Sequence, residues 1–333
     1  MAFLASAGWG DAARERLPGD ASTRRYERLT RGAESALLMV QPEPALKTDY
    51  AIAAKLAGND PLAVVAIGRQ LTQRGFSAPK VLASDLAHGL VLIEDLGDTL
   101  LARVLEDHPD READLYGRAT DTLAAIYRST FPAEMEANGR TWTVGAYSPD
   151  VLLKETELLP EWYAPEIGMA IDATALEDWR TAWTDVLPVL DAHAPGLVLR
   201  DYHAENLFVL DDRDFESATG LIDYQDALFG HPAYDLVSLL QDARRDVDRD
   251  VEAQCIRRFC DRARIADTPE FRAAYAVLGA QRAAKIMGIF VRLARRDGKA
   301  RYLDLLPRVE ADFHRNLAHN ALTPVRQWWE AHA

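Results

Sequence analysis

The first 97 residues contain short apolar runs bounded by turn-forming residues, a pattern typical of β-strands. These runs lie at 36–40, 80–85 and 90–97. A helical period interrupts them over 60–75, where Asp60 is the expected N-cap, Pro61 fits the first turn and Gly75 is the expected C-cap. This part of the chain therefore predicts a small sheet that one helix crosses.

Beyond Gly97 the apolar residues recur three and four positions apart, which is the period of amphipathic α-helices. The clearest examples lie at 110–129, 175–190 and 271–296. A segment of another kind interrupts the helices, with apolar runs at 197–199, 207–210 and 221–223. The sequence thus predicts an α+β fold with a β-rich N-lobe over 1–97 and a larger helical C-lobe over 98–333. A hairpin at 197–226 is inserted in the C-lobe.

The inserted hairpin carries the residues that best fit a chemical role. Asp201 and Asn206 lie five positions apart in the loop between two predicted strands, and Asp223 ends the strand that follows. Phosphoryl transfer needs a carboxylate to accept the proton of the acceptor hydroxyl, and an amide oxygen and a second carboxylate to hold Mg²⁺ on the nucleotide phosphates. The alternative is that these residues only form turns. The flanking strands and the preceding β-rich lobe favour phosphoryl transfer.

Charge and composition exclude several other classes of protein. Asp and Glu number 52 against 38 Lys and Arg, a formal net charge of −14, which disfavours binding to nucleic acid or to an anionic membrane. Cys255 and Cys260 are too few for a disulfide framework or a zinc site. No run approaches the ~20 apolar residues of a membrane span, and residues 1–10 lack the pattern of a signal peptide. We therefore expect a soluble, cytoplasmic protein. We also expect a monomer.

The stretches 200–207 and 221–240 resemble the aminoglycoside phosphotransferase and choline kinase family, whose two-lobed fold is protein-kinase-like. The resemblance covers nearly the whole chain, through 18–29, 92–98 and 281–293. Within this family the chain is most similar to the bacterial anomeric kinases that phosphorylate N-acetylmuramate and N-acetylglucosamine at C1, on account of 18–29 and 224–246. The resemblance implies ATP and Mg²⁺ as requirements of the reaction.

The resemblance also implies a role for each residue of the hairpin. Asp201 resembles the catalytic base, and Asn206 and Asp223 resemble the two metal ligands. Asp235 resembles the buried Asp that braces the catalytic loop in this family.

The predicted nucleotide site departs from the kinase pattern. Glu94 to Leu96 resemble the hinge whose backbone contacts adenine. The third strand, 36–40, has no Lys where kinases place the one that binds the α- and β-phosphates, and the crossing helix has no Glu to pair with it. The loop 18–26 has one glycine, whereas the Gly-rich loop of kinases has three.

Phosphate binding must therefore come from other residues. The candidates are the arginines Arg24 and Arg25, which can bind phosphate through two hydrogen bonds, and the backbone amides of Ser22 and Thr23. Adjacent residues of a strand face opposite sides, so at most one of the two arginines points inward. The alternative is that both lie on the surface.

Several residues near the hairpin are candidates for contact with the acceptor. Leu199 stands where the family usually has a His, and His203 matches the second His of the family loop. His203 either contacts the acceptor or braces the loop through a hydrogen bond. Tyr224, Gln225 and Asp226 follow the second metal ligand, where their side chains could reach the acceptor.

The sequence thus predicts a kinase that transfers the γ-phosphoryl group of ATP to the C1 hydroxyl of N-acetylmuramate or N-acetylglucosamine, in the recycling of cell-wall sugars. Two alternatives stay open: a kinase of aminoglycosides or other small alcohols, and a pseudokinase that binds nucleotide without turnover. The missing Lys–Glu pair favours the pseudokinase. The intact set of Asp201, Asn206 and Asp223 weighs against it.

Overall fold

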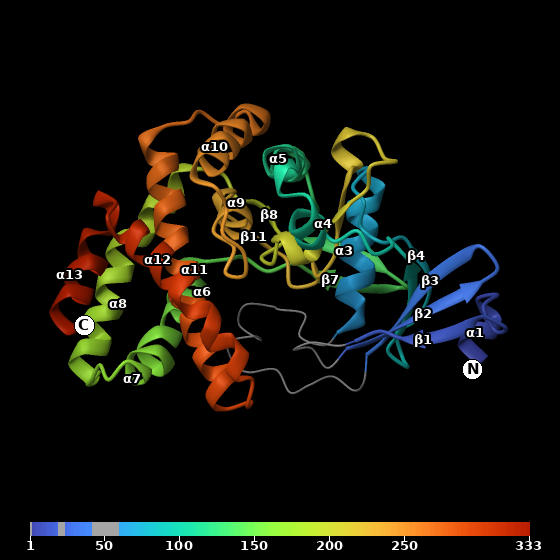
Figure 1. Ribbon diagram of the computed structural model, residues 1–333, viewed down its shortest axis with the longest axis horizontal. Helices are drawn as coiled ribbons and strands as arrows, with labels where there is room; N and C mark the ends of the chain where they lie inside the picture. The colour runs from blue at the N-terminus through green and yellow to red at the C-terminus, as the bar shows by residue number, and fades with distance from the viewer. Residues whose placement is uncertain (1, 19–23, 42–59) are drawn as a thin grey trace. The chain divides into compact units, whose positions relative to one another are not determined.

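The computed structural model describes residues 2–18, 24–41 and 60–333 (Figure 1). Contacts group these residues into two compact units. The first comprises 1–145 and 199–228, and the second comprises 146–198 and 229–333. Each unit is described by itself.

The first unit contains a five-stranded antiparallel sheet in the order β1-β2-β3-β5-β4. The strands are β1 (Ala13–Arg16), β2 (Arg25–Arg31), β3 (Glu34–Val40), β4 (Val81–Asp85) and β5 (Leu90–Glu94). Helix α1 (Ala2–Ser6) packs on one face of the sheet, where Leu4, Leu29 and Leu38 are buried. The predicted strands of this lobe are confirmed, and β1 and β2 are added to them.

Helix α3 (Pro61–Gln73) is the predicted crossing helix, and it begins where the sequence indicates (Figure 1). The side chain of Asp60 accepts a hydrogen bond from the backbone N–H of Leu62 at 2.9 Å, and Pro61 occupies the first turn. Gly75 has φ +87°, the left-handed conformation in which glycine often ends helices. Most of the helix is buried, because apolar residues follow one another along it.

The predicted hairpin forms from β9 (Leu207–Val209) and β10 (Thr219–Leu221), which pair in antiparallel register. Two backbone hydrogen bonds join the hairpin to the part of the chain that contains the sheet. Val209 N–H donates to Thr99 C=O at 2.9 Å, and Leu221 N–H donates to Ser77 C=O at 2.9 Å. The hairpin therefore belongs to the first unit. The division of the chain into lobes at Gly97 stays a prediction.

Two details of the hairpin differ from the prediction. The run 197–199 lies outside it: strand β8 (Gly196–Val198) pairs with β11 (Leu228–Gly230). Strand β10 ends at Leu221, so Asp223 lies in the turn after the strand and does not end it. A turn allows Asp223 the φ of +60° that a strand would forbid.

The remaining elements of the first unit are α4 (Leu101–Asp107), α5 (Glu112–Arg128) and the hairpin of β6 (Glu134–Ala137) and β7 (Arg140–Thr143). The second unit is mainly helical: α6 (Pro149–Thr156), α7 (Ala164–Glu166), α8 (Ala173–Val186), α9 (Ala233–Leu240), α10 (Arg249–Ala263), α11 (Pro269–Arg295), α12 (Leu306–Leu317) and α13 (Thr323–His332). The long helix α11 packs against α6, α9 and α12 (Figure 1).

Candidate active site

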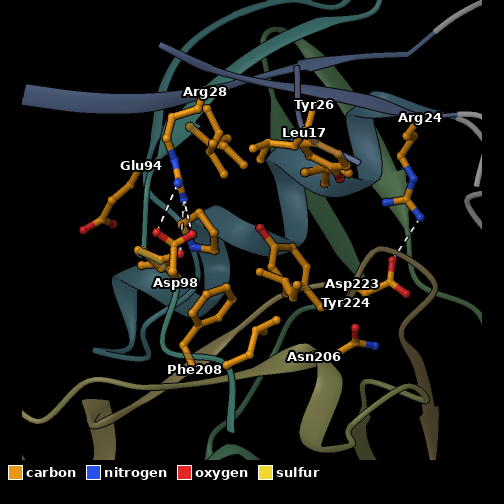
Figure 2. Close-up of a pocket in the computed structure, with 18 of the residues that line it drawn as sticks. Leu17, Arg24, Tyr26, Arg28, Glu94, Asp98, Asn206, Phe208, Asp223 and Tyr224 are labelled. Carbon is orange, nitrogen blue, oxygen red and sulfur yellow. Dashed lines mark hydrogen bonds and ion pairs between the residues drawn. The ribbon is translucent and has the colours of Figure 1, made fainter. Parts of the chain in front are cut away.

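A cavity of about 420 Å³ lies within the first unit, between the sheet and the β9–β10 hairpin (Figure 2). Leu17 and Leu37 line it from the sheet side. Phe208 and Ile222 line it from the hairpin side. Apolar walls on two opposite sides suit a flat aromatic ring.

Strand β2 sends alternate side chains into this cavity. Tyr26 and Arg28 of β2 line it, because residues two apart on a strand share a face, and so does Arg24, the residue directly before the strand. Tyr26 lies opposite Met39 and Arg28 opposite Leu37 in the β2–β3 register. At roughly 3.3 Å per residue, Arg28 and Arg24 begin about 13 Å apart. The cavity therefore has two distinct ends, which Figure 2 shows on opposite sides of Tyr26.

At the first end, Arg28 lies beside the segment that follows β5. Its guanidinium is 2.8 Å from Asp95 Oδ2 and 2.7 Å from Asp98 Oδ1. The hydrogen bond to Asp98 is the main cause that raises the pKa of Arg28. The backbone N–H of Leu96 has no hydrogen-bond partner among the described residues. This end thus offers a free backbone donor beside apolar walls, which suits the edge of a purine base.

Glu94 belongs to the same end but its side chain is already engaged. Its Oε1 is 2.7 Å from Arg213 of the β9–β10 turn, and its Oε2 accepts from the Lys80 N–H at 3.1 Å. Arg213 also donates to the hydroxyl of Ser77 at 2.9 Å. Glu94 therefore ties the end of β5 to the β9–β10 turn.

At the second end, Arg24 contacts the predicted metal ligand Asp223. One guanidinium nitrogen is 3.0 Å from Asp223 Oδ1, and the other donates to Gln225 Oε1 at 2.8 Å (Figure 2). Gln225 Nε2 donates to the same Asp223 oxygen at 3.0 Å. Burial disfavours the charge of Arg24, but Tyr26, Asp223 and Asp226 outweigh it and raise the pKa of Arg24.

Asn206 lies in the short 3₁₀ turn before β9 and lines the cavity close to Asp223 (Figure 2). Its Nδ2 donates to Asp201 C=O at 3.0 Å and lies 3.2 Å from His203 Nε2. Because the nitrogen is used twice, the orientation of the amide is fixed. Asn206 Oδ1 then accepts no hydrogen bond from the described residues.

The two oxygens Asn206 Oδ1 and Asp223 Oδ2 fit a hard cation such as Mg²⁺, which prefers carboxylate and amide oxygens. Asp223 accepts both of its hydrogen bonds on Oδ1, so its Oδ2 has no partner among the described residues. No cluster of three His, Cys, Asp or Glu side chains occurs in the described ranges. The protein therefore supplies few ligands, as is common where phosphate and water complete the coordination of Mg²⁺.

Comparisons with known proteins identify the family of the chain. The profile of a family described as phosphotransferase enzymes matches residues 14–275. The chain belongs to this family. It is 41% identical to the N-acetylmuramate/N-acetylglucosamine kinase of Caulobacter vibrioides, over 99% of this chain and 94% of that protein. It is 32% identical to the protein of the same name from Pseudomonas aeruginosa, over 90% and 83% of the two chains.

Solved structures of similar fold include a choline/ethanolamine kinase family protein from Mesorhizobium loti. It has a TM-score of 0.62 and 17% identity, over 98% of this chain and 97% of that one. A second is the gentamicin complex of APH(2")-IIa, with a TM-score of 0.59 and 14% identity, over 96% of each chain. These likenesses confirm the predicted protein-kinase-like α+β fold. As a member of the phosphotransferase enzyme family, the chain is an enzyme that transfers a phosphoryl group.

Some of the predicted site residues line the cavity, and others do not. Arg24, Glu94, Leu96, Asn206, Asp223, Tyr224 and Gln225 line it. Arg25 lies on the opposite face of β2, beside Arg14 and Arg16. Asp201 and His203 lie in the loop behind Asn206, outside the cavity lining, and His203 is buried in contact with Asn206. Ser22 and Thr23 lie outside the described residues.

The residues predicted to contact the acceptor instead contact other residues of the protein. Gln225 holds Arg24 and Asp223, and the contact of His203 with Asn206 is that of a loop-bracing histidine. Asp226 is half-buried, and its carboxylate contributes to the charge environment of Arg24. Contact of these residues with an acceptor stays a prediction.

Sequence reasoning missed the contact between Tyr224 and α3. A Cβ placed on Gly68 would lie 2.4 Å from the Tyr224 hydroxyl, so only glycine lets the helix approach this ring. Burial raises the pKa of Tyr224 far above its ordinary value. A glycine inside an apolar helix, at a cost of about 1 kcal/mol relative to alanine, was the one available signal. Arg28 and Arg213, which contact the segment 94–98, carried no signal in the sequence.

Proposed function

We propose that this phosphotransferase transfers the γ-phosphoryl group of ATP to the C1 hydroxyl of N-acetylmuramate or N-acetylglucosamine. The observation that carries the proposal is the 41% identity, over 99% of the chain, to a kinase named for these two sugars. The cavity supports it, because the chain presents a slot for a base at one end and two cation-binding oxygens at the other.

In this proposal the nucleotide lies along β2. The base lies between Leu37 and Phe208 and meets the free N–H of Leu96, while the phosphates extend towards Arg24 and Asp223. Asn206 Oδ1 and Asp223 Oδ2 would hold Mg²⁺, which when bound neutralises charge on the phosphates. Asn206 is oriented for this by Asp201 C=O and His203.

Asp201 is the proposed base that accepts the proton of the sugar hydroxyl. It precedes Asn206 by five residues in the same loop, and the Asn206 amide bonds its backbone, so the base and one metal ligand form one rigid unit. An anomeric hydroxyl is more acidic than the other hydroxyls of a sugar. The transition state of phosphoryl transfer is loose, so the reaction depends little on the strength of the nucleophile. One carboxylate base therefore suffices, and positioning of the reactants contributes most of the rate enhancement.

The test is a panel of acceptors incubated with ATP and Mg²⁺, with ADP release as the readout. We expect turnover with N-acetylmuramate and N-acetylglucosamine, and none with their methyl glycosides, which are blocked at C1. The product should lose its reducing end and release phosphate in mild acid. Phosphorylation of a methyl glycoside would show that another hydroxyl is used. Turnover with aminoglycosides alone would contradict the sugar assignment, and nucleotide binding without turnover of any acceptor would indicate a pseudokinase.

A further inference from the structure

The inward face of β3 offers no positive charge to a nucleotide. Leu37 lines the cavity, and Met39, two residues on, is fully buried on the same face. Helix α3 contributes Val64 to the cavity lining and Gly68 to the contact with Tyr224. Neither element can supply a cation–carboxylate pair at this place.

Among the described residues, the cations Arg24 and Arg28 line the cavity, and they differ in the groups that they contact. Arg28 lies at the base end and is paired with two carboxylates, Asp95 and Asp98. Arg24 lies at the other end and is paired with Asp223, whose second oxygen faces no partner among the described residues. Two ion pairs thus fix the position of Arg28, whereas the carboxylate that contacts Arg24 belongs to a predicted metal ligand.

The environment of Arg24 keeps its charge in place. Its side chain is 11% exposed, so the guanidinium is largely shielded from water yet still lines the cavity. Gln225 holds one of its nitrogens at 2.8 Å. A planar guanidinium can bind two phosphate oxygens at once, and a charged hydrogen bond is stronger where water is excluded.

We propose that Arg24 is the residue that binds the α- and β-phosphates of the nucleotide, in place of the Lys that β3 lacks. Without nucleotide, Arg24 neutralises Asp223. When nucleotide is bound, the guanidinium turns to the phosphates while Gln225 keeps hold of it, and Asp223 becomes free for the cation. This proposal rests on the proposed nucleotide orientation, but it does not depend on which acceptor is phosphorylated.

The exchange of partners has a thermodynamic consequence. Nucleotide that takes Arg24 away from Asp223 improves the affinity of Asp223 for Mg²⁺, and by reciprocity Mg²⁺ improves the affinity for nucleotide. A purely structural Arg24 would not do this. It would only fix Asp223, and its loss would affect every ligand of the cavity alike.

The experiment measures equilibrium binding of ADP and of adenosine to the full-length chain by calorimetry, in EDTA and in Mg²⁺. Arg24→Met should weaken ADP binding in EDTA by at least about tenfold, the loss of one strong charged contact. Adenosine, which has no phosphate, should bind as it does to the unchanged protein. Arg24→Lys keeps the charge but cannot form two parallel hydrogen bonds to phosphate. Its ADP affinity should lie between those of Arg24→Met and the unchanged protein.

Arg25→Met is the matched control, because Arg25 is the adjacent arginine on the outer face of β2. It should leave both affinities unchanged. Intact adenosine binding in Arg24→Met shows that the variant is folded. Equal ADP affinity in Arg24→Met and the unchanged protein would overturn the proposal, and so would an equal loss of ADP and adenosine. If no acceptor is phosphorylated but ADP affinity alone falls, the proposed acceptor fails and the role of Arg24 stands.

Discussion

In the first unit Arg24 meets Asp223 at the wall of a cavity, where the carboxylate side chain is 37% exposed. In the second unit Lys285 meets Glu155 at 2.9 Å with both residues buried, at 9% and 2% exposure. Tyr147 donates to Glu155 Oε2 as well, and Gln281 Nε2 lies 3.2 Å from it. In the first pair Asp223 Oδ2 has no partner among the described residues, whereas in the second pair both carboxylate oxygens of Glu155 have partners.

We propose that this difference distinguishes charged residues that bind a ligand from charged residues that stabilise the fold. A buried pair with complete partners gains little from a ligand, but loss of one member leaves the other charged and buried. A pair at a cavity wall costs less to break, because water or a ligand can replace the missing partner. Substitutions in the two units should therefore separate activity from stability.

The largest effect is expected for Asp201→Asn in the first unit. The substitution removes the proposed base, so kcat should fall by about 10²–10⁴-fold, while ADP affinity and melting temperature stay near those of the unchanged protein. Steady-state kinetics and calorimetry check this. Retention of more than about a tenth of kcat would exclude Asp201 as the base.

The opposite result is expected for Lys285→Met in the second unit. It leaves Glu155 buried with its charge unbalanced, and should lower the free energy of unfolding by about 3–5 kcal/mol with unchanged ADP affinity. The control is Lys154→Met, which removes an exposed Lys from its ion pair with Glu157 and should cost under about 1 kcal/mol. Urea titrations of both variants decide it. Equal losses would mean that burial of the pair has no energetic weight.

Asp223→Ala and Asn206→Ala should weaken Mg²⁺-dependent nucleotide binding while leaving the fold intact. We expect about 10- to 100-fold for the carboxylate and less for the amide, because only the carboxylate neutralises charge on the cation. Titration of Mg²⁺ at fixed ADP measures both. Identical titration curves for a variant and the unchanged protein would remove that residue from the metal site.

Gly68→Ala should lower stability by about 1–3 kcal/mol, because its Cβ would lie 2.4 Å from the buried Tyr224 hydroxyl. Tyr224→Phe removes that hydroxyl and should recover part of the loss. The double variant, compared with both single ones by urea titration, isolates this contact. If the two losses simply add, the helix does not depend on Gly68 for its approach to Tyr224.

The elements that the sequence predicts depend on interactions between residues close together in the chain. The elements that it does not predict depend on interactions between residues far apart or lack an apolar pattern. Strands β3, β4 and β5 have apolar runs, and Asp60 caps α3 through a contact two residues away, so both were predictable. Strand β1, with the sequence Ala-Arg-Glu-Arg, is exposed throughout and has no apolar period. The pairing of β8 with β11 joins residues about thirty positions apart, which no local pattern encodes.

The same limit applies to the candidate site. Strand alternation predicted that only one of Arg24 and Arg25 points inward, but which one depends on the register of β2 against β3. The sequence predicted that Asn206 and Asp223 lie close together, since Asn206 comes directly before β9 and Asp223 follows β10 of the same hairpin. The contacts of Arg24 with Asp223 and Gln225 join residues some 200 positions apart, and only the folded chain brings them together.

The smallest predicted effect concerns His231 in the second unit, a histidine that is 8% exposed. Its Nδ1 accepts from the Ala233 N–H at 3.1 Å, so its proton is on Nε2, which lies 3.3 Å from His193 Nδ1. Burial, with a smaller contribution from His193, lowers the pKa of His231 to about 3. The folded protein thus holds this histidine neutral.

In the unfolded chain His231 has an ordinary histidine pKa near 6.5. Below that pH the unfolded chain binds a proton at His231 that the folded chain does not bind. The stability due to His231 is therefore complete above about pH 7 and is lost as the pH falls from about 6.5 towards 3, by about 1.4 kcal/mol at pH 5.5. His231→Asn keeps an acceptor for the Ala233 N–H and removes the titrating ring, so its stability should change less between pH 7.5 and 5.5. The exposed His108→Asn is the control and should keep the original slope. Parallel slopes for all three proteins in urea titrations would show that burial of His231 does not govern the acid sensitivity of the second unit.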